Sequence, residues 1–122
     1  MDRKPAKSFT DLVAWQKGHE LVLRVYRITE SFPRRLWKLI SQMQGAAASI
    51  CANIAEGFRR RSKPDKVRLL NIALGSLDET HYFLILARDL GYAKVETEMA
   101  LTDEVGRLLY CYIEAIQRSR GE

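Results

Sequence analysis

The stretch SICANIAEGFRRRS, Ser49 to Ser62, contains the features that decide the fold. Apolar residues recur in it at spacings of three and four, as they do on one face of a helix. Gly57 is a glycine of the kind that follows helix ends, and we expect the helix to stop there. Three arginines then lead to Ser62, which, with Pro64 and an acid at the third position, predicts the start of another helix. The stretch therefore indicates two helices joined by a short basic turn.

The same periodicity continues in both directions along the chain. With three prolines, seven glycines and no N-G or D-G turn between alternating segments, the chain has few strand signals. Residues 1–8 are expected to be a flexible N-terminus. The predicted helices, separated by Pro33, the basic turn and Gly91, cover about residues 10–31, 34–56, 63–90 and 95–118. Four long helices with short links predict an all-α protein, an up-and-down antiparallel four-helix bundle that forms a single domain.

Length and composition restrict the class of protein further. A chain of 122 residues with 47% hydrophobic residues can bury one core without disulfides or metals. No apolar run reaches the ~18 residues of a membrane span, and the N-terminus lacks the apolar stretch of a secretory signal. Cys51 and Cys111 are far apart and lack a C-x-x-C partner, so we expect packed thiols. The sequence therefore predicts a cytoplasmic protein with no membrane association, no cofactor and no metal.

Positive charge is concentrated in one section of the chain. Residues 34–68 hold nine Lys/Arg and two Asp/Glu, whereas residues 69–122 hold five and nine. Such a section can attract RNA or DNA, although a charged run is more often a solvated face. The cations flank both ends of the second predicted helix and are Arg34, Arg35, Lys38, Arg59, Arg60, Arg61, Lys63, Lys66 and Arg68. Because the bundle is antiparallel, one compact patch cannot hold them all.

Two aromatic residues beside these cations could stack on nucleic-acid bases. They are Trp37 and Phe58, each adjacent in sequence to basic residues. Trp37 could instead pack at a subunit interface, and Phe58 could close the hydrophobic contact that follows a helix-ending glycine. These alternatives remain open from the sequence.

A narrow polar seam lies beside the apolar stripe of the second predicted helix. Its members are Gln42, Ser49, Asn53 and Glu56. A buried amide needs a partner, because leaving it unpaired costs about 1–3 kcal/mol, so we expect Asn53 to be hydrogen-bonded. Glu56 faces the negative end of the helix dipole and should pair with one of the three arginines, with the N-terminus of the third predicted helix, or with Ser76 or Thr80. We expect the seam to set helix register and to shape the turn.

The third predicted helix is apolar around most of its circumference. Several of its residues can face a core, but Tyr82 and Ile85 point elsewhere, on a face that they share with Gly75. This surplus favours self-association through these three residues over a wide core stripe on a monomer.

Catalytic signals are weak. His19 and His81 lie on different predicted helices, and no metal-binding or phosphate-binding motif occurs. A dyad of Cys51 and His81 is conceivable on facing helices, but no activating group lies near the cysteine in sequence. We expect a protein that is not an enzyme.

Four motifs together resemble a known family. They are F-x-D-L-x-A-W-Q-K (Phe9 to Lys17), F-P (Phe32 and Pro33), A-A-x-S-I-x-x-N-I-A-E-G (Ala46 to Gly57) and I-A-x-G-S-L-x-E (Ile72 to Glu79). Over about residues 9–118 the chain resembles bacterial proteins encoded within intervening sequences of large-subunit (23S) ribosomal RNA genes. The resemblance implies a four-helix bundle, a ring-shaped homopentamer, no known catalytic activity and a suspected nucleic-acid role. The family is distantly similar to the accessory variability proteins of retroelements, which are basic pentamers that associate with RNA and a reverse transcriptase.

One departure from the family pattern affects the expected function. Where relatives usually carry a basic pair ahead of the alanines, this chain has Gln42, Met43, Gln44 and Gly45. If that pair binds phosphate in relatives, this chain cannot bind phosphate in the same way. The resulting prediction is a non-enzymatic ring that binds RNA or DNA through its basic turns without sequence-specific readout, and the alternative is an adaptor ring that binds another protein.

Overall fold

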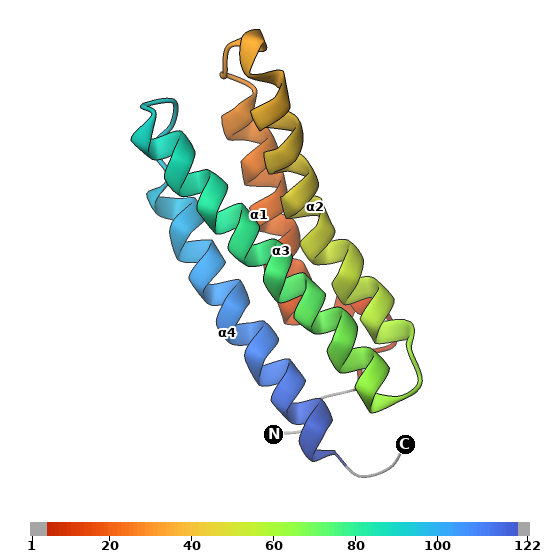
Figure 1. The fold of residues 1–122 in the computed structure, drawn as a ribbon. Coiled ribbons are helices and arrows are strands. Elements are labelled where there is room, and N and C mark those ends of the chain that lie inside the picture. Colours follow the sequence, from red (N-terminus) through yellow and green to blue (C-terminus); the bar gives the residue numbers. More distant parts are fainter. Residues whose placement is uncertain (1–4, 120–122) are drawn as a thin grey trace.

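The computed structural model describes residues 5–119, which form a bundle of four long helices (Figure 1). No strand occurs among these residues. The helices are α1 (Val13–Thr29), α2 (Trp37–Arg59), α3 (Lys63–Asp89) and α4 (Glu96–Arg118), and two short 3-10 helices, η1 (Phe9–Asp11) and η2 (Arg34–Leu36), precede α1 and α2. Successive helices run in opposite directions, so the expected all-α, up-and-down antiparallel bundle is confirmed.

Neighbours in the bundle follow the order of the chain. α1 contacts α2 and α4, and α3 contacts α2 and α4, whereas no Cα atoms of the diagonal pairs lie within 8 Å of each other. The pair α2–α3 has the most extensive contact of the four. The α1–α2 and α3–α4 links therefore lie at one end of the bundle, and the α2–α3 link lies at the other, beside the end of α4 (Figure 1).

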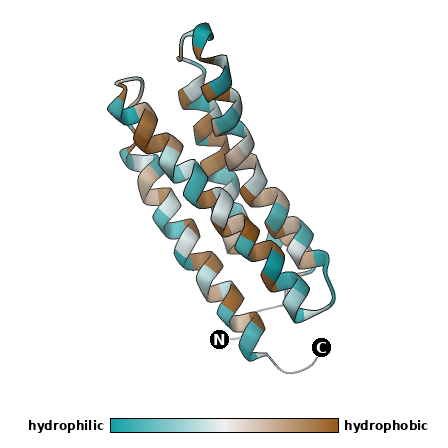
Figure 2. Ribbon diagram, in the orientation of Figure 1, coloured by the Kyte–Doolittle hydropathy of each residue, from teal (hydrophilic) through white to brown (hydrophobic). Residues whose placement is uncertain are grey.

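The core runs along the bundle axis. Apolar and polar residues alternate along the helices (Figure 2), and the apolar stripes turn inward. Fully burying a Leu, Ile or Val side chain contributes about 1.5–3 kcal/mol relative to exposure. Large side chains with at most 1% exposure come from all four helices and include Leu21, Met43, Ile50, Ile54, Leu70, Leu84, Val105 and Leu109. None of the described helices is long and apolar enough to cross a membrane.

The first helix begins later than the sequence indicated. Ser8 caps η1, because its hydroxyl accepts from the Thr10 N–H and Asp11 closes a capping box. The chain then extends at Leu12, so α1 starts at Val13 without a side-chain cap. Of the predicted flexible N-terminus, residues 1–4 lie outside the described range. The backbone N–H groups of Lys7 and Ser8 donate to the Asp11 carboxylate, at 2.9 and 3.2 Å.

The second helix ends differently from the expectation. Gly57 is not a helix-ending glycine, because α2 continues to Arg59 and Gly57 is buried inside it. A Cβ at Gly57 would lie 3.4 Å from Leu69 Cβ, so the position brings α2 and α3 close together. The Lys66 ammonium donates to the carbonyl oxygens of Phe58, at 2.7 Å, and of Gly57, at 3.4 Å. A side chain from α3 therefore caps the last turn, which needs no left-handed glycine.

The third helix has both of the predicted end signals. The Ser62 hydroxyl accepts from the Asp65 N–H at 3.3 Å, and Pro64 lies in the first turn. At the other end Gly91 has a φ of 84°, the only positive φ among residues 5–119. The Tyr92 and Gly91 N–H groups donate to the Ala87 and Arg88 carbonyls, which is a Schellman motif.

Candidate nucleic-acid interface

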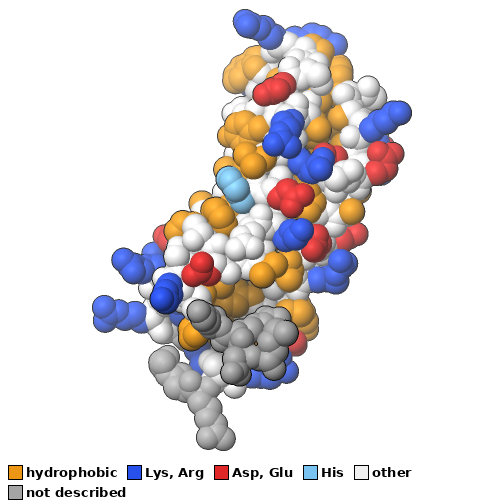
Figure 3. Space-filling model, turned by 180° about the vertical axis from the view of Figure 1, so that it is seen from behind, with side chains coloured by type: hydrophobic (Ala, Val, Ile, Leu, Met, Phe, Trp, Pro, Cys, Tyr) orange, Lys and Arg blue, Asp and Glu red, His pale blue; other side chains and the backbone are white. Residues whose placement is uncertain are grey.

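The predicted cations lie at both ends of the bundle. Figure 3 shows Lys and Arg side chains at each end, with both signs of charge mixed between them. Arg34, Arg35 and Lys38 lie at the end that carries the α1–α2 link, which we call the α1–α2 end. The remaining six cations lie at the opposite, α2–α3 end. The 23 residues of α2 separate the two clusters by about 34 Å.

At the α2–α3 end, two of the predicted cations cap helices. Lys66 holds the last carbonyls of α2, and its ammonium lies 5.6 Å from the centre of the Phe58 ring. Lys63 donates to the carbonyl oxygen of Ser119, directly after α4. Both cations thereby offset the negative carbonyl end of a helix, which gives them a structural role.

Two further cations of this end pair with carboxylates. Arg60 Nη2 lies 2.9 Å from Glu56 Oε2, and Arg68 Nη2 lies 3.2 Å from Asp65 Oδ1. Exposed pairs of this kind contribute about 0–1 kcal/mol, so a phosphate can displace the carboxylate. Arg59 and Arg61 are exposed and form no ion pair within residues 5–119.

The α1–α2 end also contains cations that were not predicted from the sequence. Arg34, Arg35 and Lys38 are exposed, and Arg35 Nη2 donates to the Tyr92 hydroxyl at 3.1 Å. This bond ties the cluster to the α3–α4 turn, where Arg88 and Lys94 line a hollow of about 440 Å³. Arg88 pairs with Asp89 at 2.9 Å. In an antiparallel bundle the turns at Pro33 and Gly91 lie at the same end. This order was the sequence signal that could have placed Arg88 and Lys94 beside the predicted cluster.

The two candidate stacking residues differ in exposure. Trp37 is 63% exposed, and the Lys38 ammonium lies 5.6 Å from the centre of its ring. Phe58 is half-buried inside α2 beneath Lys66. Of these two residues, Trp37 is therefore the one whose aromatic ring is open to solvent at a basic end of the bundle.

The polar seam is only partly assembled as expected. Asn53 Nδ2 donates to the Ser49 carbonyl at 2.8 Å and to the Ser49 hydroxyl at 3.0 Å. Ser49 Oγ in turn lies 2.8 Å from Ser76 Oγ, so the seam joins α2 to α3. Glu56 is exposed and pairs with Arg60, one turn away, rather than with Ser76 or Thr80.

One predicted member of the seam is replaced by a neighbour. The side chain of Gln42 is exposed and forms no hydrogen bond with the other residues that the structure describes. Gln44 makes the interhelical contact instead, because its Nε2 donates to the Thr29 hydroxyl of α1 at 3.1 Å. The seam therefore faces α3 through Ser49, whereas Gln44 faces α1.

The outer face of α3 is apolar in part. Tyr82 is 56% exposed and Ile72 is 43% exposed, while Ile85 is half-buried. Gly75 is exposed, and a Cβ there would meet nothing within 4 Å. Tyr82 and Gly75 are thus exposed enough to contact a partner, whereas only part of the Ile85 side chain is accessible.

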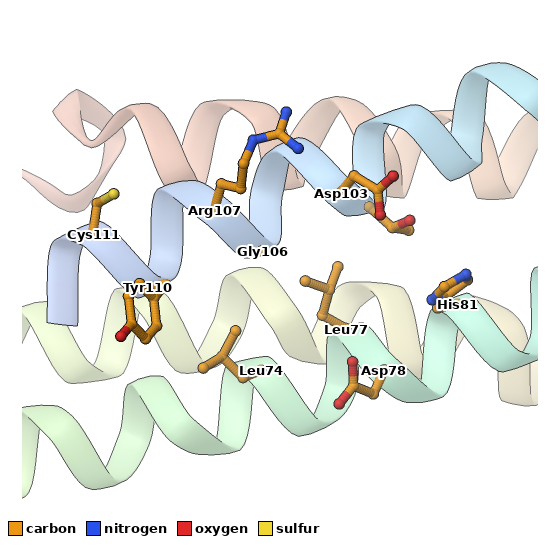
Figure 4. A pocket seen from close by; sticks show the side chains of 10 residues that line it. Leu74, Leu77, Asp78, His81, Asp103, Gly106, Arg107, Tyr110 and Cys111 are labelled. Carbon is orange, nitrogen blue, oxygen red and sulfur yellow. The ribbon is translucent and has the colours of Figure 1, made fainter. Parts of the chain in front are cut away.

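A groove between α3 and α4 was not anticipated from the sequence. It holds about 410 Å³ and is lined by Leu74, Leu77, Asp78 and His81 of α3, with Gly106 and Tyr110 among the residues of α4 (Figure 4). Because Gly106 has no side chain, the floor of the groove is open opposite Leu77. Two carboxylates on its rim, Asp78 and Asp103, form no ion pair within the described chain. The only sequence signal for this groove was Gly106, a single glycine within the helical pattern of the fourth predicted helix.

The conceivable catalytic dyad does not assemble. Cys51 is buried against α1, where its Sγ donates to the Trp15 carbonyl at 3.7 Å. His81 lines the groove between α3 and α4. Burial raises the pKa of the Cys51 thiol to about 11, so it is protonated at neutral pH and a poor nucleophile. Within residues 5–119 no group of three His, Cys, Asp or Glu side chains could hold a metal ion.

Comparisons with known proteins agree with the motifs and the fold. The family described as 23S rRNA-intervening sequence protein matches residues 10–111. A solved structure of a protein with unknown function from the S23 ribosomal protein family of Bacteroides thetaiotaomicron VPI-5482 is similar, with a TM-score of 0.76 and 28% sequence identity. The alignment covers 84% of this chain and 99% of that one. No curated protein matches the chain significantly. The chain therefore belongs to the 23S rRNA-intervening sequence protein family.

Proposed function

We infer that the protein is a cytoplasmic, non-enzymatic homo-oligomer, a pentameric ring, that binds RNA or DNA through its basic ends. The observation that carries this function is the cluster of exposed Arg34, Arg35 and Lys38 at the α1–α2 end, with Lys94 exposed on the adjacent turn. Cations of this kind bind phosphates and release the counterions condensed on the nucleic acid. In a closed ring, rotation repeats the cluster around one rim, so a single strand can meet several copies.

Self-association is supported by the apolar surface outside the core. Ile72 and Tyr82 on α3 and Tyr110 on α4 are each more than 40% exposed, and Tyr110 lines the α3–α4 groove. Large apolar side chains that the core leaves exposed can be covered by a second copy of the chain. The open position at Gly75 lets a neighbouring backbone come close to α3.

A second candidate function is that of an adaptor ring that binds another protein and no nucleic acid. The α3–α4 groove favours it, because a largely apolar lining with two carboxylates against one arginine, Arg107, fits an amphipathic peptide better than a phosphate chain. Salt dependence distinguishes the two candidates, because only phosphate contacts give a steep loss of affinity with salt.

The test measures binding of labelled single-stranded and double-stranded RNA and DNA at several salt concentrations, with the assembly state followed by sedimentation. We expect the variant R34A/R35A to bind more weakly, with a salt slope lowered by about one for each phosphate-binding cation that is removed. The variant K17A/R107A removes two cations from the side of the bundle and should keep the wild-type slope. Absence of binding to all four ligands by folded, assembled protein would refute the nucleic-acid function and favour the adaptor.

A further inference from the structure

We propose that the nucleic acid held at the α1–α2 end is single-stranded, with one base stacked on the Trp37 indole and adjacent phosphates on Arg34, Arg35 and Lys38. This inference rests on the proposed nucleic-acid function and names the class of ligand and the residue that selects it. It is drawn from the exposure of Trp37, its surroundings and the helix on which it lies.

Trp37 is held outside the core by its own helix. It is the first residue of α2, and its indole has the greatest exposure of the large hydrophobic side chains in the described range, at 63%. Leu36, Leu39 and Ile40, its neighbours in the same turns, pack against the core. Rotating α2 to bury the indole would withdraw these aliphatic side chains from the core. The packing of α2 thus fixes a flat aromatic ring in solvent.

One cation lies over this ring, and two more precede it in the chain. The Lys38 ammonium lies 5.6 Å from the centre of the indole, and Arg34 and Arg35 precede it in the tight turn η2. Arg34 and Lys38 form no ion pair with the carboxylates of residues 5–119, and Glu30, exposed at the end of α1, is not paired with them. A base on the ring would therefore place its phosphates beside cations that are free to bind them.

This arrangement fits a single strand better than a duplex or a protein. In a duplex each base is already stacked between its neighbours, so an indole outside the helix has no π face to contact. In a single strand every base presents such a face, and stacking on an aromatic side chain tolerates any sequence. The core of a protein interface, in contrast, is depleted of lysine, whereas Trp37 has a lysine directly over its ring.

The opposite end lacks this arrangement. Phe58 is half-buried, and Lys66 above it is bound to the carbonyls at the end of α2. A base could not displace Lys66 without uncapping the helix. Single-strand selectivity is therefore assigned to the α1–α2 end.

The experiment compares wild type with W37A and W37F for binding of a single-stranded oligonucleotide and a duplex of the same sequence at two salt concentrations. We expect W37A to bind the single strand roughly 5- to 150-fold more weakly at both salt concentrations, because one stacked base is lost. Its salt slope should be unchanged, since no cation is removed. W37F, which keeps a ring, should lose less, and duplex affinity should not change. The matched control is L23A, which removes a large apolar side chain with 42% exposure from α1, outside the self-association surface and the basic ends, and should bind as wild type does.

Circular dichroism and sedimentation show whether each variant is folded and assembled, which is expected because Trp37 lies outside the core. Equal single-strand affinity of W37A and wild type would overturn the inference, as would an equal loss for duplex and single strand, or a W37A protein that dissociates. Each of these results leaves nucleic-acid binding by wild type in place. Failure of wild type to bind any nucleic acid would instead overturn the proposed function itself.

Discussion

Lys66 provides the sharpest test of which cations are structural. Its ammonium donates to the Phe58 carbonyl at 2.7 Å and to the Gly57 carbonyl at 3.4 Å. A hydrogen bond to a charged group contributes about 1.5–3 kcal/mol when well buried, and a cation at a helix C-terminus contributes about 0.3–1 kcal/mol. Because Lys66 is only half-buried, we expect K66M to lower the free energy of unfolding by about 1–2 kcal/mol. Methionine keeps an apolar stem beside Phe58, so the change isolates the loss of the cap.

The assay is thermal and urea unfolding at one fixed protein concentration, because assembly would make the transition depend on concentration. For a domain of this length about 1 kcal/mol corresponds to roughly 4 °C in Tm. The control is R61M, which removes an exposed cation from the same end of the bundle and should change stability by less than about 0.5 kcal/mol. Equal stability of K66M and R61M would refute the assignment of Lys66 as a helix cap.

The packing of α1 against α2 and the buried thiol give two further predictions. A Cβ at Gly18 would lie 3.1 Å from Cys51 Sγ, so G18A should destabilise the fold in urea unfolding. At Gly45 a Cβ would meet nothing within 4 Å, so G45A should stabilise the helix by about 0.5–1 kcal/mol in the same assay. The reverse order would contradict the close approach of α1 and α2. Because burial raises the pKa of Cys51 from 9.0 to about 11, the folded state keeps a proton that the unfolded state releases, and stability should fall as the pH rises from 9 to 11. A C51A variant should lose this dependence of stability on pH. In alkylation of the folded protein at pH 8, the exposed Cys111 should react before Cys51. Rapid modification of Cys51 in the folded protein would contradict its burial.

The number and order of helices were predictable because their signals are local. Apolar spacing, the Ser62 cap and the glycine after α3 each act within a few residues, and the structure has the helices in the predicted order. The end of α2 was predicted wrongly because its cap comes from another helix. Lys66 lies eight residues beyond the Phe58 carbonyl that it holds, and nothing in the sequence around Gly57 signals that contact.

The candidate interface was predictable in composition but not in arrangement. The sequence identified cations on both sides of the second helix and two aromatic residues beside them. It favoured Trp37 over Phe58 only slightly, because both have basic neighbours in sequence and only Phe58 follows a glycine expected to end a helix. Their difference in exposure arises from the direction in which α2 presents each side chain and from the position of Lys66. The α3–α4 groove depends in the same way on how two helices pack around Gly106.

By itself, the sequence determined that this chain forms an antiparallel four-helix bundle, that it belongs to its family and that its positive charge is concentrated around α2. These properties follow from periodicity, caps and composition, each of which acts along the chain. Only the tertiary structure decided which cations are free and which are structural. Lys63 reaches a carbonyl 56 residues away, and Arg35 reaches a tyrosine hydroxyl 57 residues away. Such contacts exist only after the helices have packed, because packing brings the carbonyl ends and turns of distant segments within reach of a side chain.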